Sequence, residues 1–168
     1  MRVCYPAGVI GLRYFTYYGS PIGRMVLLSD GMSLTGLGFQ EKIPESAIIN
    51  DDLPVFLQTK SWLDAYFRGE NPPMDIPLRP GGTAFQHRVW EILNDIPYGK
   101  VCTYGDIAHR MNCRSSQAIG QAVGRNPIAI VIPCHRVVGV KGQLTGYAWG
   151  LEKKQWLLLH EKILCETM

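Results

Sequence analysis

Two short apolar runs and one longer periodic segment dominate the first part of the chain. The two runs lie within residues 20–39 and flank a Ser-Asp-Gly triplet, which is typical of two β-strands joined by a turn. Between Pro54 and Arg68, apolar residues recur at helical spacing and predict a helix. Its apolar residues include Phe56, Leu57, Leu63 and Phe67. The pattern indicates a small α/β domain, in which no group of reactive side chains stands out.

The segment Asn71–Gly82 interrupts this periodicity. It contains four prolines and two glycines, which cannot continue a helix or a central strand. We therefore expect a linker here and predict two domains, residues 1–78 and residues 79–168.

Three helices are predicted directly after this linker, before the terminal one. The first spans residues 83–96 and is amphipathic. Its apolar face consists of Phe85, Val89, Ile92 and Leu93. The second begins at Thr103, because Asp106 follows three residues later in a capping-box arrangement. The third begins at Ser115 or Ser116, and two short helices joined by a tight turn predict a helix-turn-helix.

The outward side of the third helix has little side-chain bulk. Its outward residues are Gln117, Gly120, Gln121 and Gly124, with Arg114 and Arg125 at the two ends. Such a face lets a nucleic-acid backbone approach closely, and arginines suit phosphate groups. Alternatively, the glycines serve only to pack helices together, because two-helix turns also occur in proteins that never bind DNA.

Composition and charge narrow the class of protein. Of 168 residues, 46% are hydrophobic and 18% are charged, which excludes a disordered or fibrous chain. Residues 1–82 carry seven basic and eight acidic side chains, whereas residues 83–168 carry ten and six. The basic second part suits a polyanionic partner, although a solvated basic face explains the same excess.

Five cysteines are spread along the chain, at Cys4, Cys102, Cys113, Cys134 and Cys165. No two follow a C-x-x-C spacing and no cysteine–histidine spacing suits zinc, so we expect free thiols in a reducing compartment and no metal. Residues 1–20 contain no apolar segment long enough for a signal peptide or a membrane span. We therefore expect a cytoplasmic protein without a membrane partner.

One cysteine lies beside two potential cations. The apolar, β-branched segment Ile128–Ile132 predicts a buried strand that ends at Pro133, so that Cys134 emerges from the core. His135 and Arg136 follow it and favour a thiolate. Because neighbouring side chains of an extended chain point to opposite faces, either a sharp turn or a water must connect the thiol to the histidine. The alternative is a buried structural cysteine.

A histidine that takes a proton from a thiol needs an acid to hold its tautomer. Glu161 is the candidate, because it lies on a largely apolar stripe of the predicted terminal helix, residues 151–164. The other residues of the stripe are Leu157, Leu164 and Met168. Spacing alone equally allows Glu161 to pair with Lys154 or Lys162.

These motifs together resemble a known family. The sequence PCHRV follows an apolar segment, is preceded by NP, and is followed by GYAWG and KKQWLLLHE. In this order the motifs resemble the methylated-DNA–protein-cysteine methyltransferases, the O6-alkylguanine-DNA alkyltransferase family. The specific part of the resemblance runs from about Phe85 to Lys162, and the N-terminal part matches only loosely.

The resemblance implies a fold and a reaction. Members have a ribonuclease-H-like α/β N-terminal domain followed by a mostly helical, winged-helix-like domain with a helix-turn-helix. They repair duplex DNA by moving the alkyl group of O6-alkylguanine to their own cysteine, once per molecule and without a cofactor. The preference between alkylguanine and O4-alkylthymine stays open. On this basis we expect a monomer that needs no obligate protein partner.

Roles of single residues follow from the matching positions. Cys134 would accept the alkyl group, His135 would act as the general base through a water, and Glu161 would orient His135. Asn126 would brace the active-site turn. Tyr104 would donate a hydrogen bond to the guanine ring as it leaves.

The resemblance also implies which residues touch DNA. The second helix of the helix-turn-helix would enter the minor groove, and the damaged base would be flipped out of the duplex. The residues expected around the flipped base are Val137, Tyr147, Ala148 and Trp149. Those expected to contact DNA are Arg114, Ser115, Gln117, Gly120, Gln121, Arg125 and Arg136, of which Arg136 would also tie the active-site region together.

The chain departs from the family pattern at three places. Gln117 stands where many relatives have an arginine that fills the gap left by the flipped base. Trp149 stands in a glycine-rich turn and predicts a narrowed pocket. The N-terminal zinc ligands of some relatives are absent, since only Cys4 is present there and no histidine precedes His87.

Two other classes of function compete with alkyl transfer. A protein that only binds alkylated DNA would not need Cys134. A cysteine hydrolase would use a cysteine, a histidine and an acid, but it would have no use for a basic helix-turn-helix.

Overall fold

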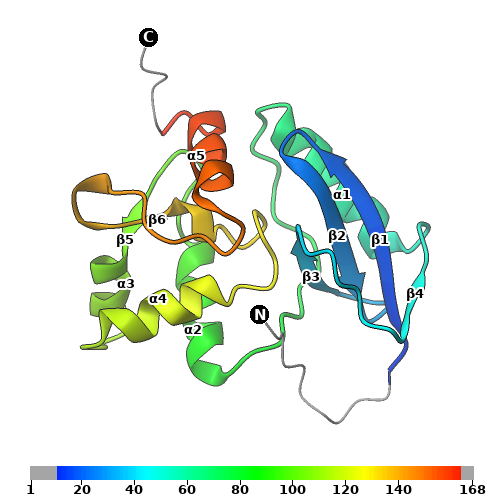
Figure 1. The fold of residues 1–168 in the computed structure, drawn as a ribbon, viewed down its shortest axis with the longest axis horizontal. Helices are drawn as coiled ribbons and strands as arrows, with labels where there is room; N and C mark the ends of the chain where they lie inside the picture. The colour runs from blue at the N-terminus through cyan, green and yellow to red at the C-terminus, as the bar shows by residue number, and fades with distance from the viewer. Residues whose placement is uncertain (1–10, 164–168) are drawn as a thin grey trace. The chain divides into compact units, whose positions relative to one another are not determined.

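The computed structural model describes residues 11–163 and divides the chain into two compact units, Met1–Gly82 and Thr83–Met168 (Figure 1). Each unit is built around its own buried apolar residues. Cys4, Cys165, Leu164 and Met168, which the sequence singled out, lie outside the described residues. No helix within residues 11–163 is both long and apolar enough to span a membrane.

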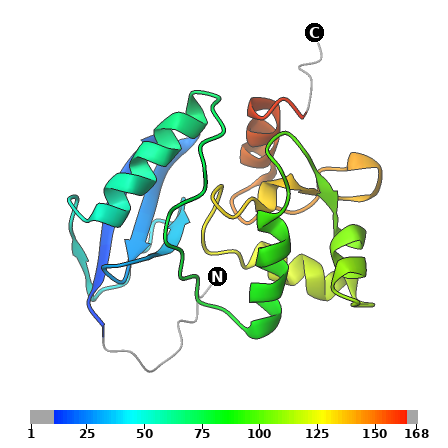
Figure 2. The same ribbon diagram turned by 180° about the vertical axis from the view of Figure 1, so that it is seen from behind.

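The first unit is a four-stranded sheet with one helix. Its elements are β1 (Arg13–Ser20), β2 (Gly23–Ser29), β3 (Leu34–Gly38), β4 (Ala47–Ile49) and α1 (Pro54–Phe67). The strand order is β3-β2-β1-β4, in which only the β1–β4 pair is parallel. Figure 2 shows α1 lying across one face of this sheet. The two strands and the helix predicted from the sequence are confirmed, and β1 and β4 are additional.

The turn between β2 and β3 forms as the Ser-Asp-Gly triplet predicts. The Asp30 carboxylate accepts hydrogen bonds from the backbone N–H groups of Met32 and Ser33. Gly31 has a φ of 100°, which a residue with a side chain rarely adopts. Side-chain capping and a glycine therefore close this hairpin.

The end of the first unit is set by backbone hydrogen bonds to β3. The N–H of Leu34 donates to Pro77 O and the N–H of Arg79 donates to Leu34 O. These bonds keep residues 77–79 with the sheet, so the units divide at Gly82, after the boundary at residue 78 predicted from composition.

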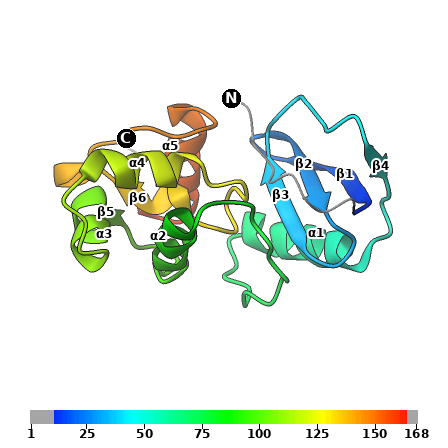
Figure 3. The ribbon, with the colours of Figure 1, turned by 90° about the horizontal axis from the view of Figure 1, so that it is seen from below.

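The second unit is mostly helical. Its helices are α2 (Ala84–Asn94), α3 (Tyr104–Arg110), α4 (Ser116–Gly124) and α5 (Leu151–His160), with 3-10 turns at Cys134–Arg136 and Val140–Gly142. Two short parallel strands, β5 (Cys102–Thr103) and β6 (Val137–Val138), pair beside them. Helix α4 packs against both α2 and α3 (Figure 3), so the predicted helix-turn-helix is confirmed.

Side-chain caps explain where these helices begin. Thr83 and Thr103 each cap a helix, and both take part in complete capping boxes, with Gln86 and Asp106 respectively. The Ser115 hydroxyl accepts from the N–H of Ala118 and caps α4. The indole N–H of Trp90 donates to an α4 carbonyl at 2.9 Å and joins α2 to α4.

The predicted strand at Ile128–Ile132 is wrong. The segment is buried, but it forms successive turns. Asn126 imposes them, because its Oδ1 accepts from the N–H of Ile128 and its Nδ2 donates to Ile132 O at 2.8 Å. Ile130 has a φ of 68°, which breaks an extended chain. Side-chain hydrogen bonds from one asparagine thus override the β propensity of the segment.

The terminal helix is shorter than predicted. Helix α5 ends at His160, and Glu161 is its C-terminal capping residue rather than a member of a continuing helical stripe. Lys162 follows with a φ of 60°, so the chain leaves the helix there. Glu161 therefore reaches the site from a helix end.

Candidate active site

Cys134 opens the 3-10 turn and is buried, with 5% of its surface exposed. Its N–H donates to Ile132 O at 2.8 Å. The Asn126 amide donates to the sulfur at 3.1 Å with the same Nδ2 that bonds Ile132 O. The side chain that shapes the preceding turns therefore also holds the thiol.

Two opposing effects act on this thiol. Burial raises the pKa of Cys134 above its ordinary value, because a buried thiolate loses its hydration. The hydrogen bond from Asn126 and the positive charge of Lys154 lower the pKa of the same group. The thiol of Cys134 therefore keeps its proton until a base removes it.

His135 is buried beside the acid predicted for it. Its Nε2 lies 2.7 Å from Glu161 Oε1, and both side chains are fully buried. Because an ionised Glu161 accepts, Nε2 carries the hydrogen, and Nδ1 has no hydrogen-bond partner within residues 11–163. Burial lowers the pKa of His135, so the imidazole is neutral near pH 7. Nδ1 is then a free acceptor for a proton.

The Glu161 carboxylate accepts from three residues. His135 supplies one donor, Arg136 supplies Nε at 2.8 Å and Nη2 at 3.0 Å, and the N–H of Gly99 donates at 3.2 Å. Burial opposes ionisation, but the hydrogen bonds from His135 and Arg136 and the positive charge of Arg136 outweigh it and lower the pKa of Glu161 to about 2. Glu161 thus pairs with His135 and Arg136 rather than with Lys154, whose ammonium bonds backbone carbonyls.

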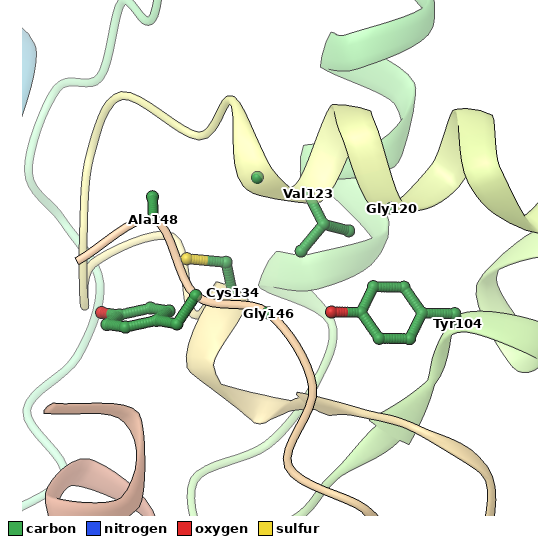
Figure 4. A pocket seen from close by; sticks show the side chains of 8 residues that line it. Tyr104, Gly120, Val123, Cys134, Gly146 and Ala148 are labelled. Carbon is green, nitrogen blue, oxygen red and sulfur yellow. The ribbon is translucent and has the colours of Figure 1, made fainter. Parts of the chain in front are cut away.

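A cavity of about 210 Å³ opens onto Cys134 (Figure 4). Its walls come from α3, α4, the 3-10 turn and the loop before α5. The lining residues are Tyr104, Gly120, Val123, Gly124, Cys134, Gly146, Tyr147 and Ala148. Figure 4 shows the Tyr104 hydroxyl directed across the cavity toward the side that carries Cys134. In this structure that hydroxyl donates to Thr145 O at 3.2 Å, and burial raises the pKa of Tyr104.

Comparisons with known proteins agree on one family. Residues 84–163 match the model described as "6-O-methylguanine DNA methyltransferase, DNA binding domain" and residues 13–80 match its ribonuclease-like domain. A methylated-DNA–protein-cysteine methyltransferase of Haemophilus influenzae is 46% identical over 89% of this chain and 87% of the relative. The chain belongs to this methyltransferase family.

Further relatives extend the match to structures. A methyltransferase of the same name from Methanosarcina acetivorans is 44% identical, covering 86% of this chain and 96% of the relative. The Mycobacterium tuberculosis O6-methylguanine methyltransferase superposes with a TM-score of 0.82 at 38% identity over 94% of this chain and 97% of the other. A structure of the M. tuberculosis protein in complex with DNA gives 0.81 at 41% identity, covering 89% and 92%. The predicted order, a ribonuclease-like domain followed by a helical DNA-binding domain, is confirmed.

In this methyltransferase the predicted DNA-contacting residues of α4 and its two ends differ in how exposed they are. Arg114, Ser115, Gln117, Gln121 and Arg125 are exposed on or beside α4. Gly120 is half-buried, and an added Cβ would lie 3.9 Å from the Tyr104 ring. Gln117, Gly120 and Gly124 share one helix face because they are three and four residues apart. Gln117 therefore lies on the face of α4 that lines the cavity.

Three predicted contacts differ in the structure. Arg136 is buried, and its guanidinium bonds Glu161 and Ile96 O, so it ties the site together from inside rather than facing DNA. Val137 is fully buried in β6 and does not line the cavity. Trp149 is half-buried and is not among the residues that line the cavity either. The narrowing expected from Trp149 is therefore not seen.

Several site groups were missed by sequence reasoning. The backbone of Gly99, the side chain of Val123 and the backbone of Gly146 carry no chemical signal in the sequence. Lys154 carried one, because a lysine among the leucines of an amphipathic helix is either solvated or functional. Helical spacing indicated Lys154 only as a partner of Glu161, whereas the structure places its ammonium among backbone carbonyls.

Proposed function

We propose that this protein repairs DNA by moving the alkyl group of O6-alkylguanine to the sulfur of Cys134. The observation that carries the proposal is the buried thiol at the cavity wall, followed by a neutral histidine. Its Nε2 is held by Glu161, and its Nδ1 has no hydrogen bond to any residue that the structure describes. Membership of the methyltransferase family supplies the reaction class.

The reaction begins with proton removal from Cys134. His135 Nδ1 takes the proton through a bridging water, and Glu161 stabilises the resulting imidazolium. Asn126 donates to the sulfur as it becomes a thiolate. The sulfur then attacks the alkyl carbon, the carbon–O6 bond breaks, and its electron pair stays on the guanine.

Tyr104 acts on the leaving group. Its hydroxyl, directed into the cavity, donates to the guanine ring as negative charge develops there. The guanine takes a proton from Tyr104 in place of the alkyl group, solvent returns a proton to Tyr104, and the thiol proton passes to solvent through His135. The product on the protein is a thioether, which acid–base groups do not cleave, so each molecule reacts once.

The damaged base must leave the duplex to reach this thiol. The exposed residues of α4 and the arginines at its ends suit binding from the minor groove. The cavity then receives the flipped base between Tyr104 and the Gly146–Ala148 segment. A cytoplasmic location belongs to the same proposal and rests on the free thiols of Cys102, Cys113 and Cys134.

A titration of the protein with methylated duplex tests this function. We expect methyl loss from the DNA to stop at one equivalent per protein molecule, because the thioether is permanent. A cysteine hydrolase would continue past one equivalent, and a protein that only binds alkylated DNA would remove no methyl group. Either outcome would contradict the proposal.

The side chain of Gln117 is expected to fill the gap left by the flipped base. Extruding a base costs a few kcal/mol of stacking and pairing. An arginine offsets more of that cost than glutamine, because it stacks as a planar cation with several donors. Gln117→Arg should therefore speed repair of methylated duplex, and Gln117→Ala should slow it, each by about tenfold.

Free methylguanine base serves as the control, because it needs no flipping. We expect neither variant to change the rate with the free base. Equal effects of Gln117→Ala on duplex and free base would place Gln117 in the chemistry or the fold and end the intercalation role.

A further inference from the structure

Lys154 is a fully buried lysine on α5, and its hydrogen bonds to the described residues all go to carbonyl oxygens. Its ammonium donates to Val137 O at 2.5 Å, Thr145 O at 2.9 Å and Gly146 O at 3.1 Å. These three bonds use all three donors of the group. Burial lowers the pKa of Lys154 to about 8, whereas negative charge on Cys134 raises it. No carboxylate within residues 11–163 pairs with Lys154. Burying a cation without such a partner costs free energy.

The three carbonyls belong to two separate segments. Val137 directly follows the 3-10 turn that carries Cys134, and its carbonyl lies at the start of β6. Thr145 and Gly146 begin the loop whose Gly146, Tyr147 and Ala148 line the cavity. Lys154 therefore joins the segment of the nucleophile to the wall of the cavity.

One of these carbonyls is shared with the proton donor. Thr145 O accepts from Lys154 Nζ and also from the Tyr104 hydroxyl at 3.2 Å. A Cβ at Gly146 would lie only 3.8 Å from the same hydroxyl, so the loop packs closely against Tyr104. A displacement of this loop would therefore move the hydroxyl relative to Cys134.

We propose that Lys154 is a positioning residue for alkyl transfer, which holds the Thr145–Ala148 segment and, through Thr145 O, the Tyr104 hydroxyl in place opposite Cys134. The role rests on the proposed function. In this role Lys154 changes the rate of the chemical step, and it does so by positioning Tyr104. A lysine that merely stabilised the fold would act on the rate independently of Tyr104.

A double-variant cycle separates the two roles. Single-turnover rate constants are measured at saturating methylated duplex for wild type, Lys154→Met, Tyr104→Phe and the double variant. We expect Lys154→Met to slow transfer by about tenfold or more when Tyr104 is present, and by less than about threefold in the Tyr104→Phe background. Effects that multiply would overturn the proposal, because Lys154 would then act independently of Tyr104.

Two further variants keep the result interpretable. Lys154→Arg retains a cation with several donors and should restore part of the rate. Lys153→Met removes the same formal charge from the next residue of α5 and leaves the three carbonyls bonded, so it should match wild type at saturating DNA. A slow Lys153→Met variant would show that lost charge alone explains the effect and would overturn the role of Lys154.

Folding is checked by circular dichroism and thermal unfolding. Should Lys154→Met not fold, Lys154→Gln replaces it in the cycle, since its amide keeps a donor on a shorter chain. Failure of both to fold would make Lys154 a structural residue only. A wild-type protein that transfers no methyl group would overturn the function itself, whereas normal wild-type transfer with multiplying effects would overturn the role of Lys154 alone.

Discussion

Replacing Cys134 with serine or alanine is expected to abolish alkyl transfer and to leave DNA affinity nearly unchanged. A serine hydroxyl is ionised far less readily than a thiol and is a weak nucleophile without strong activation. Serine is close to cysteine in size and can still accept the hydrogen bond from Asn126. The exposed residues of α4 are untouched by either change. Single-turnover assays measure transfer, and fluorescence anisotropy at fixed salt measures binding to methylated duplex.

The two variants also control one another. Alanine removes the hydrogen-bond acceptor that serine keeps, so similar DNA affinities in both would show that the turn at Cys134 survives. A serine variant that still transferred the methyl group would end the thiolate mechanism. A large loss of DNA affinity in both variants would assign Cys134 to the fold.

Glu161→Gln is expected to slow transfer by about 100-fold or more, the size of a general-base contribution. Four donor atoms converge on the Glu161 carboxylate, from His135, Arg136 and Gly99. A glutamine amide would turn its own N–H groups toward some of these donors and would no longer stabilise the imidazolium. The exposed Glu152, on the first turn of α5, offers a matched control, because Glu152→Gln removes an acid of the same helix away from the site.

The same variant changes how stability depends on pH. The folded-state pKa of Glu161 is lowered to about 2 from 4.5, so its ionised form stabilises the fold above pH 4.5. This contribution, about 3 kcal/mol, is lost as pH falls from about 4.5 toward 2. Urea unfolding should therefore show a difference between wild type and Glu161→Gln that narrows in acid. A rate equal to wild type, or a stability difference constant with pH, would contradict this role of Glu161.

Local chemistry made much of the second unit predictable. Thr103 with Asp106, and Ser115 before an apolar helix face, mark helix starts that the structure contains. These signals work because a cap is satisfied by residues three positions away, whatever the rest of the chain does. The hairpin of β2 and β3 is predictable for the same reason, since its turn is closed by Asp30 and Gly31.

The errors have two physical causes. The Ile128–Ile132 segment has the composition of a strand, but the side-chain amide of Asn126, two residues before it, bonds both of its ends. Strand β4 is three residues long and at a sheet edge, so it offers too few positions to show alternation. The pattern of apolar and polar residues along the chain shows neither effect.

The sequence predicts the reactive residues of the active site, but it does not predict the groups that hold them in position. Cys134 and His135 are marked by chemistry and by the family motif. Spacing alone left the partner of Glu161 open, because its contacts with His135 and Gly99 bridge 26 and 62 positions of the chain. The three carbonyls around Lys154 belong to the backbone, which the identity of a residue does not reveal.

The central claim is that the alkyl group ends on the sulfur of Cys134, and peptide mapping by mass spectrometry tests it most directly. The protein is incubated with duplex that carries one O6-methylguanine, digested, and sequenced by fragmentation. The account predicts that the peptide containing Cys134 gains one CH₂ unit, as a methyl group replaces the thiol hydrogen, with fragment ions that place it on Cys134. An unmodified Cys134 peptide after the DNA has lost its methyl group, or a methyl group on another residue, would contradict the account.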